Sequence, residues 1–443
     1  MSAPDFSLLA KRRFGPMFVV QFIGAFNDNA LKYAMLFLVT FTLYKGDENG
    51  AASLAALATG LFILPYFLFS ALAGQIADGW DKAKLMRIVK AAEIVFMALG
   101  LAGLALQSVP LLLTVLFLMG CHSTIFGPVK YSILPQHLGP NEIMGGTAMI
   151  EAGTFLAILG GQLMPNFVPP WEAGLVATGL AVLGFLASLA IPPAPPAPGG
   201  VRVERNVFRS TWHVLKSAQD GRDAWLCILG ISWFFAVGAV LLNDFAPLVT
   251  NQLGAGKPVV TLFLLVFSIS IAIGSLAVNR LLGGRVSARY VPLAALLMAG
   301  FMIDLWPATG GFVVTAPGAD IARFVRAPGS WRILIDLAGL AFAGGMFIVP
   351  LYALLQTNSP VAERSRIIAA NNIVNSLVIV LVMAVVIAMA KYGASISAVI
   401  ATLGFSTLVV ALGSCWLLPE TMIKRLIRRA LGRTQPSPPQ DIA

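Results

Sequence analysis

The stretch that decides the fold lies near the N-terminus, where residues 16–43 read PMFVVQFIGAFNDNALKYAMLFLVTFTL. This apolar run is longer than the roughly 20 residues that an α-helix needs to cross the hydrocarbon core of a bilayer. It is also too long for the apolar part of a signal peptide, so we expect a retained helix. A polar group in its middle, from Asn27 to Lys32, predicts a membrane-spanning helix with chemistry at membrane depth.

Eleven further apolar runs follow this stretch. Of the 443 residues, 58% are hydrophobic and 11% are charged, whereas a soluble domain carries about 25% charged residues. We therefore expect an all-α membrane protein with twelve transmembrane helices in two six-helix, pseudo-symmetric bundles, the major facilitator fold. The expected spans are residues 16–43, 52–77, 84–106, 109–129, 145–164, 173–191, 224–249, 259–281, 288–306, 332–356, 367–390 and 393–418.

The positive charges indicate the orientation of these spans. If both termini are cytoplasmic, 22 of the 30 lysines and arginines fall in cytoplasmic segments and six fall outside. This bias is the one expected of cytoplasmic loops. The net charge of +10 therefore reflects topology, and nucleic-acid binding is not expected because no basic face is interleaved with aromatic residues.

A break in the middle of the chain separates two comparable halves. Residues 192–198 read PPAPPAP, a semi-rigid spacer, and the basic stretch after it extends to residue 223. The expected units are a first bundle (1–191), a cytoplasmic linker (192–223), a second bundle (224–418) and a basic tail (419–443), expected to form an amphipathic helix on the inner leaflet. An offset of 221 residues pairs Tyr131 with Tyr352, as expected of two related repeats.

The first span carries the densest polar cluster. Asp28 and Lys32 are four residues apart, so they share a helix face and can pair. Asn27 and Asn29 add hydrogen-bonding groups, and Asp244 occupies the corresponding place in the second half. This cluster predicts a polar head-group site, although a neutralised pair that only fixes helix packing is the alternative reading.

Other ionisable residues also lie within spans, where they need a partner or a water-filled cavity. Glu151 is surrounded by glycines, so it is read either as a cavity-facing carboxylate or as a packing residue. Lys90 and Glu93 are one turn apart and are expected to form a structural pair. Asp304 and Asp336 lie near the outer interface and are expected to be solvated.

Two further motifs complete the candidate binding site. The stretch FGPVKYSIL (residues 126–134) closes the fourth span, and we expect Pro128 to break the helix beside Lys130 and Tyr131, where the cation could hold a phosphate. In the eleventh span a polar face could line a pore or hold helices together. Its members are Asn371, Asn372, Asn375 and Ser376.

The stretch GQIADGWDK (residues 74–82) is a degraded form of the major facilitator loop signature Gly-x-x-x-Asp-Arg-x-Gly-Arg-Arg. Gly74, Asp78 and the basic Lys82 remain, and Gly79 replaces the arginine. A carboxylate here can cap the end of a neighbouring helix and latch the two halves together. We assign these three residues a gating role.

The sequence contains no motif that indicates an enzyme active site or a metal site. The three cysteines, Cys121, Cys227 and Cys415, lie in apolar spans without metal-ligand spacing, and no phosphate-binding P-loop is present. His137 and Glu142 only loosely resemble an acyltransferase box. We expect no catalytic activity, no metal and no cofactor.

The chain resembles the bacterial lysophospholipid transporter family in four segments: QFIGAFNDNALK (21–32), FGPVKYSILP (126–135), IEAGTF (150–155) and VPLYALLQ (349–356). The resemblance implies a transporter that moves lysophosphatidylethanolamine or lysophosphatidylglycerol from the outer to the inner leaflet of the bacterial inner membrane. It also implies a separate cytoplasmic acyltransferase or acyl-carrier-protein synthetase as partner, and we expect a monomer among membrane lipids. Family members tend to have a basic residue in the seventh span, where this chain reads LLND (241–244).

Two other functions are compatible with the same residues. A proton-coupled symporter or drug exporter of this fold would use Asp28, Glu151 or Asp244 as a protonation site. A membrane scaffold for an acyltransferase would transport nothing. Movement of lysolipid across liposomes distinguishes these possibilities.

Overall fold

The residues that the structure describes form twelve long helices, and eleven of these are long and apolar enough to cross a membrane. The computed structural model describes residues 6–198, 200–201, 203–312 and 318–417, and it contains no named strand within them. Each expected span agrees with one long helix to within a few residues. The first six are α1 (Gly15–Leu38), α2 (Glu48–Gly79), α3 (Lys82–Ala105), α4 (Val109–Ser132), α6 (Ile143–Leu163) and α7 (Pro170–Leu189), and the second six are α9 (Arg222–Pro247), α10 (Lys257–Leu282), α11 (Val291–Gly310), α13 (Ser330–Asn358), α14 (Arg364–Lys391) and α15 (Ile396–Leu417).

Short elements join or extend the long helices. A tight turn separates α3 from α4, and Gln107 adopts a left-handed φ of 53° in it, so the division between the third and fourth expected spans is confirmed. The remaining helices are α5 (Leu134–His137), α8 (Val207–Asp220) and α12 (Ile321–Arg326), with helical turns η1 (Phe6–Ala10), η2 (Val39–Leu43), η3 (Met164–Asn166) and η4 (Leu248–Gln252).

The linker is more structured than its sequence predicts. Residues 192–197 form no helix or strand, but the basic part of the linker folds into α8, a helix of 14 residues. Asn206 caps this helix by accepting a hydrogen bond from Arg209 N at 3.0 Å, and asparagine is a favoured residue at this N-cap position. The basic tail expected to form a helix lies outside the described residues.

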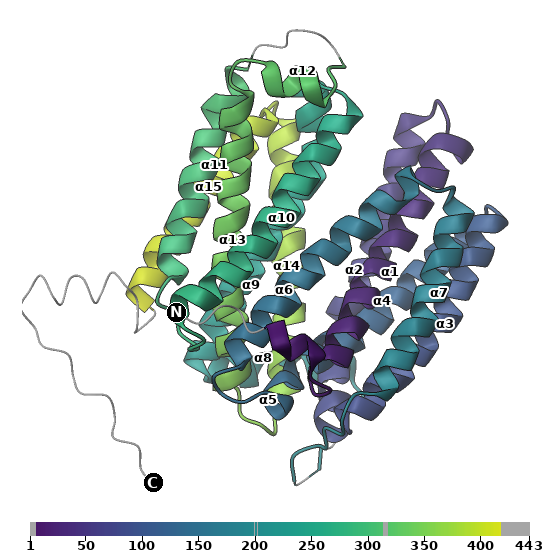
Figure 1. The fold of residues 1–443 in the computed structure, drawn as a ribbon, viewed down its shortest axis with the longest axis vertical. Helices are drawn as coiled ribbons and strands as arrows, with labels where there is room; N and C mark the ends of the chain where they lie inside the picture. The colour runs from purple at the N-terminus through teal and green to yellow at the C-terminus, as the bar shows by residue number, and fades with distance from the viewer. Residues whose placement is uncertain (1–5, 199, 202, 313–317, 418–443) are drawn as a thin grey trace, which may run out of the picture.

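The two bundles lie close together at one end and diverge at the other (Figure 1). The first bundle contains α1 to α7, and the second contains α9 to α15. Helix α8 and the start of α1 lie at the close end, which we call the linker end, and α12 lies at the opposite end. The long helices therefore form a V in this view.

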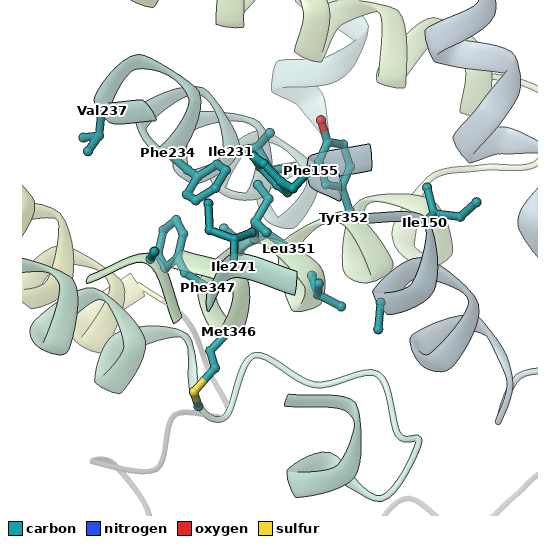
Figure 2. Close-up of a cluster of buried hydrophobic side chains, with 14 of the residues drawn as sticks. Ile150, Phe155, Ile231, Phe234, Val237, Ile271, Met346, Phe347, Leu351 and Tyr352 are labelled. Atoms are coloured by element: carbon teal, nitrogen blue, oxygen red, sulfur yellow. The ribbon is translucent and has the colours of Figure 1, made fainter. Parts of the chain in front are cut away.

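An apolar cluster joins the bundles through α6. Figure 2 shows Ile150 and Phe155 of α6 beside side chains of α9, α10 and α13. The rings of Phe155 and Phe234 meet edge to face with centroids 6.0 Å apart. The approach of α6 to α10 is also close, because a Cβ at Gly145 would lie 3.4 Å from Nδ2 of Asn279. Small residues allow such approach between membrane helices, where lipid supplies no hydrophobic driving force.

Asp78 fastens α2 to the start of α14 at the linker end. Its Oδ1 accepts a hydrogen bond from Ser365 N at 2.8 Å, and its Oδ2 accepts from both the backbone nitrogen and Nε of Arg366 at 3.1 Å. The helix-capping contact expected from the loop signature is therefore present. A Cβ at Gly74 would lie 2.7 Å from the Cβ of Ala369, so this glycine lets the two helices approach. The gating role of these residues stays a prediction.

Within the described residues, the side chain of Lys82 forms no hydrogen bond or ion pair with Asp78 or the start of α14. Its side chain is buried, and among the described residues it has no ion pair within 4.0 Å. Its backbone nitrogen donates to Ala194 O at 2.9 Å, which holds the start of the linker against α3. We therefore expect Lys82 to influence the Asp78 contact through its charge alone.

Candidate functional site

A cavity of about 360 Å³ lies between the bundles. Helices α1, α2, α4 and α6 of the first bundle and α9, α13 and α14 of the second bundle all contribute to its wall. Six of the predicted site residues line it: Asp28, Asn29, Lys130, Tyr131, Glu151 and Asn372.

Asp28 lies on the cavity wall and is held by α4. Ser123 Oγ donates a hydrogen bond of 2.6 Å to its Oδ2, whereas its Oδ1 has no hydrogen-bond partner among the described residues. Asn29 Nδ2 donates to Ala25 O one turn earlier. Asp28 therefore keeps one carboxylate oxygen that a bound group could use.

Asp28 and Lys32 do not form the ion pair that their spacing allows. Within the described residues these side chains form no ion pair within 4.0 Å, and Lys32 does not line the cavity. Its Nζ lies 5.3 Å from the ring centroid of Tyr33. The spacing of four residues places both on one helix face, but Ser123 of the neighbouring helix determines where the Asp28 carboxylate points.

Asn27 faces away from the cavity into a buried polar network. Its Nδ2 donates to Glu93 Oε1 at 2.8 Å. Glu93 Oε2 lies 2.5 Å from Lys90 Nζ, so the pair expected between these two residues is confirmed. Both side chains are fully buried, and a Cβ at Gly24 would lie 2.8 Å from Lys90 Nζ. Gly24 therefore leaves room for the ammonium group.

His122, which is not among the residues predicted from the sequence, connects this network to the cavity. Its Nε2 lies 3.2 Å from Glu93 Oε2, and its Nδ1 lies 3.4 Å from Ser123 Oγ, which in turn donates to Asp28. A continuous chain of polar groups therefore runs from Lys90 to the cavity. A histidine in an apolar span is itself a functional signal, so the sequence carries a sign of this residue's role.

A second polar group forms the opposite part of the first bundle's wall. Tyr131 Oη donates to Glu151 Oε1 at 2.5 Å, and Lys130 Nζ lies 4.5 Å from the Tyr131 ring centroid. The Tyr131 ring stacks on Tyr352 of the second bundle with centroids 4.1 Å apart. These are the two residues that the internal repeat pairs, so equivalent tyrosines meet at the boundary between the bundles.

Pro128 does not break α4, contrary to expectation. The helix continues through it to Ser132. Proline removes only one backbone donor, and membrane helices tolerate the loss where neighbouring groups compensate. Lys130 is therefore presented from a continuous helix.

Among the described residues, the second bundle contributes no charged side chain to the cavity wall. Its lining side chains are Phe235, Tyr352, Asn372, Asn375, Ser376 and Ile379. Asn375 Oδ1 accepts from Ser232 Oγ at 2.6 Å, and Asn372 Nδ2 has no partner among the described residues. Asp244, expected to line the site, is buried outside it beside Asn243 Nδ2 at 3.3 Å. Sequence offset alone does not fix the rotation of α9 about its axis.

Asp336 and Asp304 also differ from expectation. Asp304 forms an ion pair with Arg332 at 2.5 Å, and both side chains of the pair are exposed. Asp336, in contrast, is buried, with only 4% of its surface accessible. The expectation that both are solvated is therefore wrong for Asp336. Its position on the inner face of α13 explains the burial.

The family model of the Major Facilitator Superfamily matches residues 17–383. The chain belongs to this superfamily. Its curated relatives include proteins named lysophospholipid transporter LplT from Yersinia pestis and Yersinia pseudotuberculosis, which are 27% identical over 360 residues and 79% of each chain. The resemblance to lysophospholipid transporters is thus confirmed, and the chain is a multi-pass membrane transporter.

Solved structures of the superfamily share its fold. The Escherichia coli fucose:proton symporter FucP in its outward conformation superposes with a TM-score of 0.68 at 12% identity, covering 92% of this chain and 98% of the symporter. A human organic anion transporter reaches the same TM-score at 13% identity, covering 90% of this chain and 98% of that protein. At such identities the likeness establishes the twelve-helix fold alone.

Proposed function

We propose that this transporter moves lysophospholipids, chiefly lysophosphatidylethanolamine or lysophosphatidylglycerol, from the outer to the inner leaflet of a bacterial inner membrane. The observation that carries the proposal is the amphipathic cavity. One part of its wall presents Asp28, Lys130 and Glu151, and other parts present rings and aliphatic chains. Among the lining residues the apolar ones are Phe62, Ile63, Phe126, Phe155, Ile158, Phe235 and Ile379.

The charged groups match the head of a lysophospholipid. Lys130 supplies a cation for the phosphate, and the carboxylates of Asp28 and Glu151 supply acceptors for an ammonium group. A polar head needs such partners to leave water. All three charges come from the first bundle, so the phosphate would be held from that side without a basic residue in α9.

The acyl chain needs a route that keeps it out of water. Exposing a chain of about sixteen carbons would cost on the order of 10 kcal/mol, at about 0.8 kcal/mol for each CH₂. From Leu377 to Lys391 no side chain of α14 is buried, and Ile379 of this helix lines the cavity. The tail would therefore lie beside α2 and α14 in lipid while the head crosses the polar centre.

The orientation follows from the position of the closed end. The Asp78 contact joins the bundles at the linker end, which the lysine and arginine bias assigns to the cytoplasm together with both termini. This conformation would receive substrate from the outer leaflet. A monomer is sufficient for this path, and a separate cytoplasmic acyltransferase would consume the product.

Reconstitution into liposomes tests the proposal. Labelled lysophosphatidylethanolamine is added to the outer leaflet, and albumin extraction measures how much remains there. We expect inward movement that Asp28→Asn and Lys130→Gln strongly reduce and that Asp244→Asn, outside the cavity, leaves intact. Correctly folded protein that moves no lysolipid would contradict the proposal.

A proton-coupled symporter is the second candidate, and the chain of ionisable groups from Glu93 through His122 to Asp28 favours it. Such a protein would take up a soluble solute only when a proton gradient is imposed. The same liposomes with and without a gradient distinguish the two functions. Lysolipid movement that is independent of the gradient supports the first proposal.

A further inference from the structure

Helix α8 presents three faces that differ in burial and polarity. Successive residues of an α-helix are about 100° apart around the axis. One face, formed by Ser210, Val214 and Ala218, is buried against the bundles. The two other faces are exposed and differ sharply in character.

The second face is apolar and uncovered. Phe208 is 80% exposed and Trp212 is 68% exposed, and their spacing of four residues places them side by side. With Leu215 they flank a shallow apolar pocket of about 130 Å³ whose other wall is Phe67 and Leu68 of α2. Phe67 is itself exposed on the outside of the spanning helix, so this face of α8 continues the lipid-facing surface of α2.

The third face is polar and lies next to the aromatic face. Arg209, His213, Lys216 and Asp220 are all exposed on it. A helix with adjacent apolar and basic faces suits the boundary between acyl chains and phosphate groups. Tryptophan is also the side chain enriched at that boundary.

We infer that α8 lies in the membrane interface at the linker end, with Phe208 and Trp212 inserted among acyl chains and Arg209 and Lys216 directed toward lipid phosphates. The occupant of the uncovered face is the lipid bilayer itself. A soluble protein partner fits less well, because the face is continuous with a wall that lipid already covers.

This placement connects the lipid surface to the closed end of the transporter. Ser210 of α8 accepts a hydrogen bond from Gln75 of α2. Ser217 Oγ donates to Glu363 Oε2, just before α14, at 2.8 Å. Helix α8 thus bridges the seam between α2 and α14 that Asp78 also closes.

Environment-sensitive labels on the full-length protein test the inference. In a parent with Cys121, Cys227 and Cys415 replaced by alanine, single cysteines at Phe208→Cys and Trp212→Cys carry a nitrobenzoxadiazole probe. Asp220→Cys, on the polar face of the same helix, is the matched control. The proteins are reconstituted into vesicles of phosphatidylethanolamine and phosphatidylglycerol, with or without bromine on the acyl chains.

We expect blue-shifted emission at positions 208 and 212 that brominated lipid quenches, and emission at position 220 that aqueous iodide quenches. Two independent apolar positions keep the test valid if one variant folds poorly. Labels at 208 and 212 that respond to iodide as position 220 does would overturn the inference. Labels shielded from both quenchers would also overturn it, because a protein surface would then cover the face.

Discussion

The cavity wall of the first bundle carries Asp28, His122, Lys130 and Glu151, whereas the wall of the second bundle carries amides, a hydroxyl and aromatic rings. Each of these four ionisable groups also contacts a polar group or an aromatic ring of the first bundle itself. If opposite charges faced each other across the cavity, they would form an ion pair when the substrate leaves, and separating that buried pair would be costly. The difference indicates that one bundle holds the head group while the other can move past it.

The ion pair that joins the two bundles lies elsewhere. The Asp78 carboxylate binds Arg366 at the linker end, outside the cavity. Within the cavity the bundles meet through neutral contacts such as the Tyr131 and Tyr352 stack. The ionic contact is thus reserved for the closed end, where it can stabilise one conformation.

The largest effect is expected from the buried network behind the first wall. Glu93→Gln leaves the ammonium of Lys90 buried without a counter-charge, which costs about 3–5 kcal/mol of stability. Thermal unfolding in detergent measures the loss, and adding Lys90→Met should restore most of it. An unchanged unfolding midpoint in the single variant would show that this charge pair is unimportant for the fold.

Asp28→Asn directly tests the charged side of the cavity, which the first bundle forms. It removes a charge that contributes about 2–3 kcal/mol in a hydrogen bond to a cation, so transport should fall by roughly 100-fold with the fold intact. Asp244→Asn, the same change in the second bundle, should have little effect. Equal losses in the two variants would remove the asymmetry between the bundles.

Asp78→Asn tests the contact between the bundles at the linker end. Losing the charge in the bonds to Ser365 and Arg366 should shift the equilibrium toward opening by about tenfold, which corresponds to about 1.4 kcal/mol. Distances between spin labels on α2 and α14 report the shift. Asp81→Asn is the control, because Asp81 binds Lys84 N and Ala194 N within its own half. A similar shift in both variants would contradict a specific latch.

Asn372→Ala tests the uncharged side of the cavity, which the second bundle forms. A neutral hydrogen bond contributes about 1 kcal/mol, so we expect transport to fall by about fivefold at most. Initial rates in the liposome assay measure this. A loss as large as that of Asp28→Asn would mean that the second bundle also holds the head group.

The smallest effect concerns a surface pair of the first bundle. The two nitrogens of the Arg13 guanidinium lie 2.6 and 2.5 Å from the Glu142 carboxylate oxygens and hold the pKa of Glu142 below its ordinary value of 4.5. A lowered folded-state pKa stabilises the protein above pH 4.5, and this contribution is lost as the pH falls through the lower value. The pair is partly exposed, so the effect should be at most about 1 kcal/mol.

The unfolding midpoint measured against pH detects this contribution. Glu142→Gln should flatten the dependence in the acidic range and leave the midpoint near neutral pH lower than that of the parent. An unaltered pH profile would show that the pair has no net effect on stability.

The sequence by itself determined the number, length and order of the spanning helices, because the thickness of a bilayer sets how many apolar residues a span must contain. It also predicted the Lys90 and Glu93 pair, since both residues lie one turn apart on a single helix. Asp78 could be assigned a capping role because its loop signature places it at a helix end. These properties depend on local spacing.

Only the tertiary structure decided which side chains meet across helices. Asp28 binds Ser123 rather than Lys32, His122 joins the cavity to Glu93, and Asp244 is turned away from the site. Each outcome depends on how a helix is rotated about its axis and which neighbour it contacts, and hydropathy does not encode either. Lipid solvates every apolar face equally, so packing and polar partners between helices select the arrangement.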